Sequence, residues 1–288
     1  MRVERAGHVV IGYSLAGISA ALTLATAGDR VVLLDFHRDT DAIAEVPRIH
    51  RTSLGPSVSG IAFEGAVQNL LEREGVERHT DCFISNVHSG EGPIVQCDDR
   101  RWSCKGVVFA PNGTEPGIDI EGSSALQGFG LSYSAAADAP FYSSRRVAVY
   151  GDAPRVIEHA WIAGRYASEV VVLMKGDFVA TQMQLVDELR STTAVTFETH
   201  VALRSLHAGS DGLLTAIDFD GASGLRSVDV SALFVAQHAV PMTDVVRGEA
   251  AAEAIAFAGL AAGISYWEHA ELVDNGARAA RTLLTVQQ

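Results

Sequence analysis

The feature that most constrains the fold is a buried strand that leads through a glycine turn into a helix. Residues 8–11 are an apolar run typical of a buried parallel strand, residues 12–17 form the turn, and residues 18–27 have the composition of a packed helix. A second apolar strand at 31–34 follows and ends at Asp35. This order of elements predicts a Rossmann-type dinucleotide-binding unit, in which the acid binds a ribose hydroxyl.

The turn keeps two of the three glycines of the dinucleotide fingerprint. Gly12 stands at the tight turn and Gly17 at the position of close helix packing, whereas Ser14 holds the position nearest the pyrophosphate. We expect the serine hydroxyl to donate to a phosphate and the helix N-terminus to offer its free N–H groups. A Rossmann unit with an empty cleft is the alternative. The predicted phosphate-binding residues are Gly12, Ser14, Leu15, Ala16 and Gly17.

The same order of elements recurs in the second half of the chain. A strand at 146–150 leads into a turn at 151–156, a helix at 157–166 and a further strand at 169–174. The chain is therefore predicted to be α/β, with two Rossmann-like nucleotide-binding domains of three-layer ββα type.

The second turn has lost most of what a phosphate needs. Gly151 is the one fingerprint glycine that remains, and Asp152 places a negative charge at the anion-binding end of the helix. Lys175 stands where a ribose-binding acid or an arginine cluster for a 2′-phosphate is expected. We interpret this unit as a retained fold and do not expect it to bind NAD(P)H.

Charge and cysteine content narrow the classes of partner. The 288 residues carry a net charge of −13, which disfavours nucleic acid and anionic membrane surfaces and leaves a small-molecule substrate. Three cysteines do not make the disulfide framework of a secreted scaffold. The apolar stretch at 9–28 has a signal-peptide interpretation, but the strand, turn and helix above account for it better, so we expect a cytoplasmic protein. We predict no metal site.

Residues 130–142, which lead into the second strand, resemble the active-site segment of bacterial thioredoxin reductases, where Cys-x-x-Cys-Asp precedes the NADPH domain. Residues 109–113 resemble the crossover between the domains of that family, and residues 233–236 resemble the last strand of its inserted domain. Residues 257–259 resemble the start of its C-terminal Ala-Gly-Asp motif. The resemblance covers nearly the whole chain and extends to the dithiol oxidases of gliotoxin- and holomycin-type biosynthesis.

This resemblance implies two domains and a bound flavin. The FAD-binding-like domain would comprise residues 1–113 and 241–288, and the degenerate NAD(P)-binding-like domain, inserted in it, residues 114–240. A homodimer is implied by the same analogy. The cofactor would be FAD, held by the turn residues named above together with Asp35, Ala110, Gly259 and Tyr266.

The sequence departs from the family where its chemistry takes place. Ser134 and Ala137 occupy the two redox-cysteine positions, so the thiolate that a disulfide reductase needs is missing from this segment. Leu260 replaces the aspartate that binds the flavin ribityl chain in the family. Asp138 is retained, and it is interpreted either as a general acid or base or as a cap of the turn before Pro140. The candidate catalytic residues are Asp138, Ser134, Tyr133 and His269.

Three functions stay open at this point. The first is an FAD-dependent oxidase, dehydrogenase or rearrangement catalyst of a biosynthetic pathway, in which O2 completes any redox cycle. The second is a cofactor-free cyclase, isomerase or lyase that uses the emptied cleft with Asp138 as acid or base. The third is a non-catalytic binding homologue.

Overall fold

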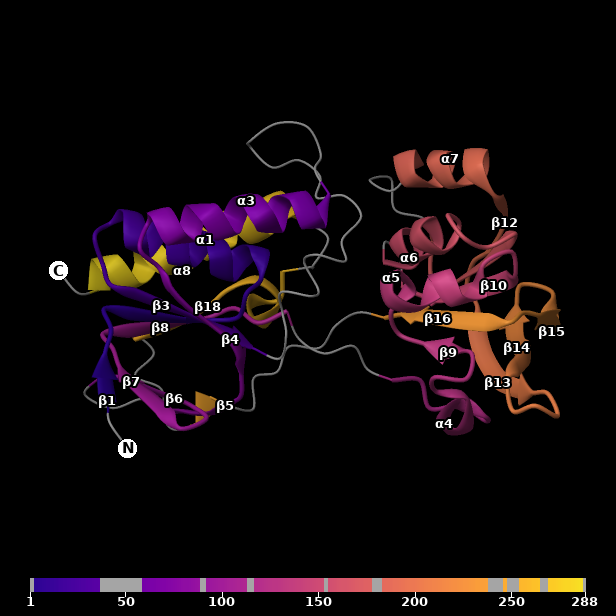
Figure 1. Ribbon diagram of the computed structural model, residues 1–288, viewed down its shortest axis with the longest axis horizontal. Coiled ribbons are helices and arrows are strands. Elements are labelled where there is room, and N and C mark those ends of the chain that lie inside the picture. The colour runs from indigo at the N-terminus through magenta and orange to yellow at the C-terminus, as the bar shows by residue number, and fades with distance from the viewer. Residues whose placement is uncertain are drawn as a thin grey trace. The chain divides into compact units, whose positions relative to one another are not determined.

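The computed structural model describes residues 3–36, 59–88, 92–112, 117–152, 155–177, 183–237, 246–247, 254–264 and 269–286. The chain divides into two compact units (Figure 1). Unit 1 comprises residues 1–114 and 239–288, and unit 2 comprises residues 115–238. Each unit is built on a five-stranded parallel sheet. The predicted fold class, α/β with two Rossmann-like nucleotide-binding units, is confirmed.

Unit 1 has three layers. Its parallel sheet has the strand order β18-β8-β2-β3-β4. These strands are β18 (Ile255–Phe257), β8 (Gly106–Phe109), β2 (His8–Ile11), β3 (Val31–Phe36) and β4 (Glu77–Cys82). The helices α1 (Leu15–Thr26), α3 (Gly60–Arg73) and α8 (His269–Val286) form the layer above the sheet in Figure 1, and the short 3-10 helix η3 (Gly259–Ala262) precedes α8.

A second sheet forms the third layer of unit 1. Its order is β1-β7-β6-β5-β17, with β1 (Val3–Arg5), β7 (Arg100–Ser103), β6 (Ile94–Cys97), β5 (Ile84–His88) and β17 (Val246–Arg247). Side chains of the central strand alternate between the two cores: Val10 packs with the helices, whereas Val9 and Ile11 pack with the second sheet. Both faces are therefore buried, which explains the uninterrupted apolar run of residues 8–11.

Unit 2 repeats this plan with a parallel sheet of order β12-β11-β10-β16-β9. The strands are β12 (Ala194–Glu198), β11 (Glu169–Met174), β10 (Arg146–Gly151), β16 (Ala232–Ala236) and β9 (Leu131–Ser132). Helices α6 (Arg155–Ala163) and α7 (Met183–Thr192) pack on one face. The antiparallel strands β13 (Ala202–Ala208), β14 (Leu214–Gly221) and β15 (Gly224–Asp229) cover the other face. The short elements are α4 (Ser123–Leu126), α5 (Ala135–Asp138) and η1 (Ala139–Tyr142).

The helix bounds differ from those predicted. The first helix begins at Leu15 rather than at residue 18, because Ser14 caps it inside the turn. In unit 2, α6 runs over Arg155–Ala163 rather than over residues 157–166.

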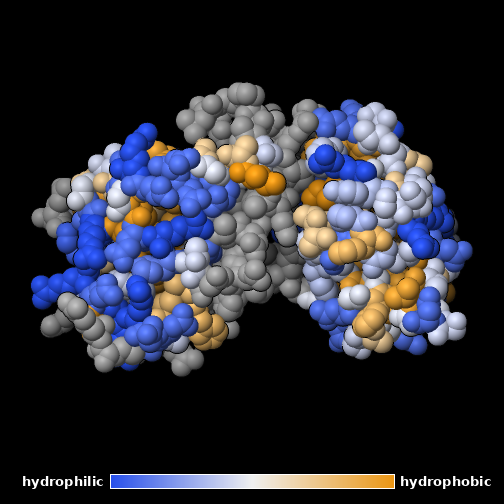
Figure 2. All heavy atoms as spheres, in the orientation of Figure 1, coloured by the Kyte–Doolittle hydropathy of each residue, from blue (hydrophilic) through white to orange (hydrophobic). Residues whose placement is uncertain are grey.

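The described part of unit 1 includes a large apolar groove on its surface. It has a volume of about 880 Å³ and lies between α1, α3 and α8. In Figure 2 apolar residues show as orange patches among the hydrophilic residues of this helical layer. No helix in the described part of the chain is long and apolar enough to cross a membrane.

Candidate nucleotide and catalytic sites

The turn between β2 and α1 is packed so closely that it requires both of its glycines. Gly12 has a φ of +108°, and a Cβ atom placed on it would lie 2.3 Å from the carbonyl oxygen of Ala110. A Cβ atom on Gly17 would lie 2.0 Å from the carbonyl oxygen of Gly12. The strand, the turn and the helix therefore approach each other through bare backbone, as in a phosphate-binding turn.

Ser14 has a different role from the one expected. Its Oγ donates to the carbonyl oxygen of Ala110 at 2.6 Å and accepts from the N–H of Gly17 at 3.0 Å. In this structure the hydroxyl proton is therefore held by Ala110, which follows β8, rather than offered to a phosphate as we expected. The N–H groups of Leu15 and Ala16, in the first turn of α1, have no acceptor within the described ranges, and they form the anion-binding end.

Asp35 lies at the end of β3, and an arginine that sequence reasoning missed binds it. The Asp35 carboxylate is 2% exposed, and its Oδ2 lies 3.3 Å from Nη2 of Arg78 on the neighbouring strand β4. Arg78 Nη1 lies 3.3 Å from Oε1 of Glu64 on α3. One guanidinium thus joins two carboxylates at the ribose end of the turn.

Tyr13, inside the turn itself, completes this cluster. The Arg78 guanidinium carbon lies 3.7 Å from the centroid of the Tyr13 ring, and the Tyr13 hydroxyl donates to Glu64 at 3.1 Å. Burial raises the pKa of the Tyr13 phenol well above its ordinary value, so the phenol keeps its proton. The sequence signal that could have identified this arginine is its place in the strand that pairs with β3. Arg78 is in register with Leu33, two residues before Asp35. We call Tyr13, Asp35, Glu64 and Arg78 the ribose-end cluster.

The C-terminal part of the chain packs against the start of α1. Gly259 has a φ of +60°, and a Cβ atom on it would lie 2.9 Å from the Cβ of Ala16. Its N–H donates to Oδ1 of Asn275 on α8 at 2.7 Å. Leu260, the next residue, is half-buried. Tyr266 lies outside the described residues, and of His269 only the backbone is described, as the first residue of α8.

Three of the candidate catalytic residues lie together in unit 2, around α5. Ser134 is the N-cap of α5 and accepts from the N–H of Ala137 at 3.2 Å. The Tyr133 hydroxyl accepts from the N–H of Ile118 at 3.1 Å.

Asp138, the last residue of α5, does not cap the turn that follows it. It stands at the N-cap position of η1, before Pro140, but its side chain makes no capping hydrogen bond. The carboxylate is half-buried and near Tyr142, where burial first and then the Asp138 charge raise the pKa of the phenol. Capping therefore does not account for this aspartate.

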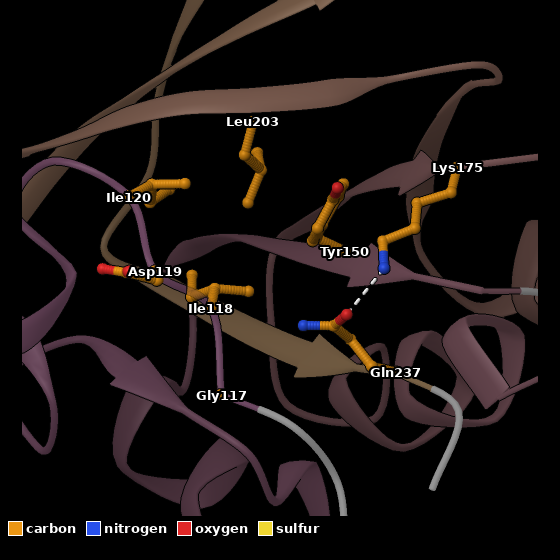
Figure 3. A pocket seen from close by; sticks show the side chains of 8 residues that line it. All are labelled: Gly117, Ile118, Asp119, Ile120, Tyr150, Lys175, Leu203 and Gln237. Atoms are coloured by element: carbon orange, nitrogen blue, oxygen red, sulfur yellow. Dashed lines mark hydrogen bonds between the residues drawn. The ribbon is translucent and has the colours of Figure 1, made fainter. Parts of the chain in front are cut away.

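Polar side chains contact each other at the strand ends of unit 2. Lys175 Nζ lies 2.6 Å from Oε1 of Gln237 and 3.5 Å from Oδ2 of Asp152, and these residues follow three adjacent strands of the sheet. Figure 3 shows Lys175 and Gln237 pointing toward each other at one side of a pocket, whose volume is about 200 Å³. This volume is below the roughly 300–1,000 Å³ of ordinary ligand pockets.

Residues 7–254 match the family model described as pyridine nucleotide-disulphide oxidoreductase. The chain belongs to this family. It is 22% identical over 253 residues to the thioredoxin reductase of Mycolicibacterium smegmatis, covering 84% of this chain and 78% of the relative. The thioredoxin reductase of Bacillus subtilis is 22% identical over 218 residues, covering 73% and 67%.

Solved structures with this fold agree over nearly the whole chain. The thioredoxin reductase of Lactococcus lactis superposes with a TM-score of 0.85 at 16% identity, over 98% of both chains. The bacillithiol disulfide reductase of Staphylococcus aureus superposes with a TM-score of 0.78 at 11% identity, over 99% of this chain and 100% of the other. The chain is thus a thioredoxin reductase-like member of a flavin oxidoreductase family that uses FAD and NADPH.

For FAD, the residues of unit 1 fit at the phosphate end. The N–H groups of Leu15 and Ala16 lie at the start of α1 with no acceptor in the described ranges, and the turn that presents them has no room for a Cβ atom at Gly12 or Gly17. At the ribose end, Asp35 is at the position of the ribose-binding acid, but Arg78 holds one of its oxygens.

Proposed function

We propose that the protein is an FAD-dependent oxidoreductase that acts on a small molecule without dithiol chemistry. The observation that carries this proposal is the phosphate cradle of unit 1, which keeps Gly12, Gly17 and the free N–H groups at the start of α1. Bound FAD would supply two-electron oxidation of the substrate, with O2 as the final acceptor.

The protein's own residues would position the cofactor. Leu15 and Ala16 would donate their N–H groups to the pyrophosphate, and Asp35 would accept from a ribose hydroxyl while Arg78 fixes its orientation. Asp138, half-buried and with no capping bond, would take or give a substrate proton. Ser134 and Ala137 stand where the family has its cysteines, which supports a reaction other than disulfide reduction.

We also propose that unit 2 does not bind NAD(P)H. The Lys175 contacts to Asp152 and Gln237 occupy the strand ends at which a dinucleotide pyrophosphate would lie, and Asp152 adds a repelling charge. Titration with NADPH, followed by its fluorescence, should show no saturable binding. Saturable binding at micromolar concentrations would overturn this part of the proposal.

The decisive experiment is the colour of the purified protein. We expect flavin absorbance at about 450 nm, either as purified or after addition of FAD. Asp35→Asn should weaken FAD binding by roughly tenfold or more, because it removes a hydrogen bond to a charged acceptor. Asp99→Asn, an exposed change in the turn between β6 and β7, is the matched control and should leave FAD binding unchanged. A colourless protein that takes up no added FAD would contradict the proposal.

A second candidate is a cofactor-free enzyme that uses Asp138 for acid or base chemistry. Two observations favour this candidate. The Asp138 carboxylate makes no capping hydrogen bond, and Leu260 stands in place of the family's aspartate. Under this candidate, the protein is colourless and Asp138→Asn abolishes turnover of its substrate, whereas the exposed change Asp187→Asn does not. If both variants bind ligand like the parent protein and no turnover is found, a binding homologue is the better description.

A further inference from the structure

Two of the three cysteines come together at strand ends in unit 1. Cys82 is the last residue of β4 and Cys97 is the last residue of β6. Cys97 is in register with Ile84, two residues after Cys82, and the N–H of Asp98 donates to the carbonyl oxygen of Phe83 at 3.2 Å. Both thiols therefore lie on the same side of this junction, within the apolar core between the two sheets.

Cys82 and Cys97 are neighbours in the same core, and each thiol shifts the pKa of the other. Each also has a second polar neighbour: the His79 carbonyl oxygen lies 3.6 Å from Cys82 Sγ, and the Asp98 carboxylate lies 3.5 Å from Cys97 Sγ. Contact with the Cys97 thiol holds the pKa of Cys82 below its ordinary value, and the same contact raises the pKa of Cys97. The Cys82 thiol loses its proton more readily than the Cys97 thiol, because the Asp98 carboxylate beside the Cys97 sulfur disfavours a second negative charge there.

Cys104 provides an internal comparison. It is buried in the same core, and its Sγ lies 3.5 Å from the carbonyl oxygen of Pro93. Burial raises the pKa of the Cys104 thiol to about 12, so it stays protonated and inert. Cys82 and Cys97 are as buried as Cys104, but Phe83, which follows Cys82, is 59% exposed.

We propose that Cys82 and Cys97 form a reversible intramolecular disulfide, a redox modification site of unit 1. The oxidant is a peroxide. The Cys82 thiolate attacks one peroxide oxygen, which breaks the O–O bond, and one water leaves as the sulfenic acid forms. The Cys97 sulfur then attacks the Cys82 sulfur and displaces a second water. In total, two thiols and one hydrogen peroxide give one disulfide and two waters, and a small dithiol reverses the change.

The disulfide would lie on the strand that also carries Arg78 of the ribose-end cluster. The charged form of Cys82 would feel the Asp35 carboxylate. A bond to Cys97 fastens the end of β4 to β6, closing a loop of 15 residues in the unfolded chain. The oxidised protein should therefore unfold at a higher temperature than the reduced protein.

The test counts the thiols of the native protein before and after hydrogen peroxide, by alkylation in denaturant and intact mass. The reduced protein should take up three alkyl groups and the oxidised protein one, with a digest that links the Cys82 and Cys97 peptides. Treatment with dithiothreitol should restore the uptake of three alkyl groups. Cys104→Ser is the matched control, because it should still form the linked peptide and show the rise in melting temperature. Cys82→Ser and Cys97→Ser should each lose the linked peptide and the rise in melting temperature.

Several results would overturn this proposal. One is that three alkylatable thiols remain after a peroxide treatment that oxidises free glutathione in the same tube. The others are a linked peptide that contains Cys104, or the loss of both remaining thiols in Cys97→Ser. The readout is independent of flavin absorbance, so it stands or fails apart from FAD binding.

Discussion

Arg78 Nη2 lies 3.3 Å from Oδ2 of Asp35, and this ion pair stands at the position where a ribose-binding acid would meet its ligand. Arg78 is 16% exposed and Asp35 is 2% exposed, so both charges are largely removed from water. The arginine therefore stabilises unit 1 and orients the acid at the same time.

Replacing Arg78 should destabilise the protein severely. Arg78→Ala leaves Asp35 and Glu64 buried without their common cation, and loss of one partner of a buried pair costs about 3–5 kcal/mol. Urea unfolding followed by circular dichroism measures this change. Arg73→Ala is the control, because Arg73 is 72% exposed and pairs with its neighbour Glu74, so its loss should cost less than about 1 kcal/mol. Equal effects of the two changes would contradict the buried cluster.

The Ser14 hydroxyl should matter for folding rather than for phosphate binding. Ser14→Ala removes the cap of α1 and the bond to Ala110, which predicts a loss of about 2 kcal/mol of unfolding free energy. Ser59→Ala removes an exposed cap of α3 and should cost about half as much. If FAD binds, its affinity should change little in Ser14→Ala. A tenfold loss of affinity without a loss of stability would restore the phosphate-donating role.

Alanine substitutions at Gly12 and Gly28 distinguish the cost of a left-handed backbone from the cost of a steric overlap. Both have positive φ, +108° and +89°, but a Cβ atom on Gly28 meets no atom within 4 Å, whereas one on Gly12 overlaps Ala110. Gly28→Ala should therefore cost about 1–2 kcal/mol for the left-handed conformation alone. Gly12→Ala should cost clearly more, or prevent folding, as measured by soluble yield and thermal unfolding.

Glu158, buried on α6, should make the stability of the protein fall as the pH rises. Burial raises its pKa from 4.5 to about 8, so between these values the unfolded chain releases a proton that the folded chain keeps. The neighbouring His159, whose pKa burial lowers to about 3, acts in the opposite direction, but only below its ordinary value of 6.5. Above about pH 6.5 the His159 effect is complete, and a comparison with Glu158→Gln separates the Glu158 effect from that of any other group.

In that window the wild-type protein should lose roughly 2 kcal/mol of unfolding free energy that Glu158→Gln does not lose. Urea unfolding at pH 6.5 and pH 8 measures both proteins. Parallel pH dependence of the two would show that Glu158 is ionised in the folded state.

The candidate site was predictable where one short segment contains all the parts. Gly12, Gly17 and the apolar strand before them predict a strand, a turn and a helix, because only residues without a Cβ atom allow that close approach. The second unit was predictable for the same reason, since Gly151 begins an equivalent turn after the buried strand β10.

The contacts that give the site its chemistry join residues far apart in the chain. Ser14 donates to a carbonyl 96 residues away, and Arg78 binds an acid 43 residues away. Neither partner is marked by local spacing, because each contact depends on which strands become neighbours in the sheet. Cys82 and Cys97 likewise meet only because β5 pairs with β6.

The sequence by itself determined the class of fold, the two turns and the absence of cysteine at positions 134 and 137, because these follow from residue type and short-range geometry. Only the tertiary structure decided that Arg78 holds Asp35, that the Ser14 hydroxyl turns inward and that Asp138 caps nothing. The physical reason is that hydrogen bonds and ion pairs depend on distances of a few ångströms, and strand pairing alone brings these groups that close.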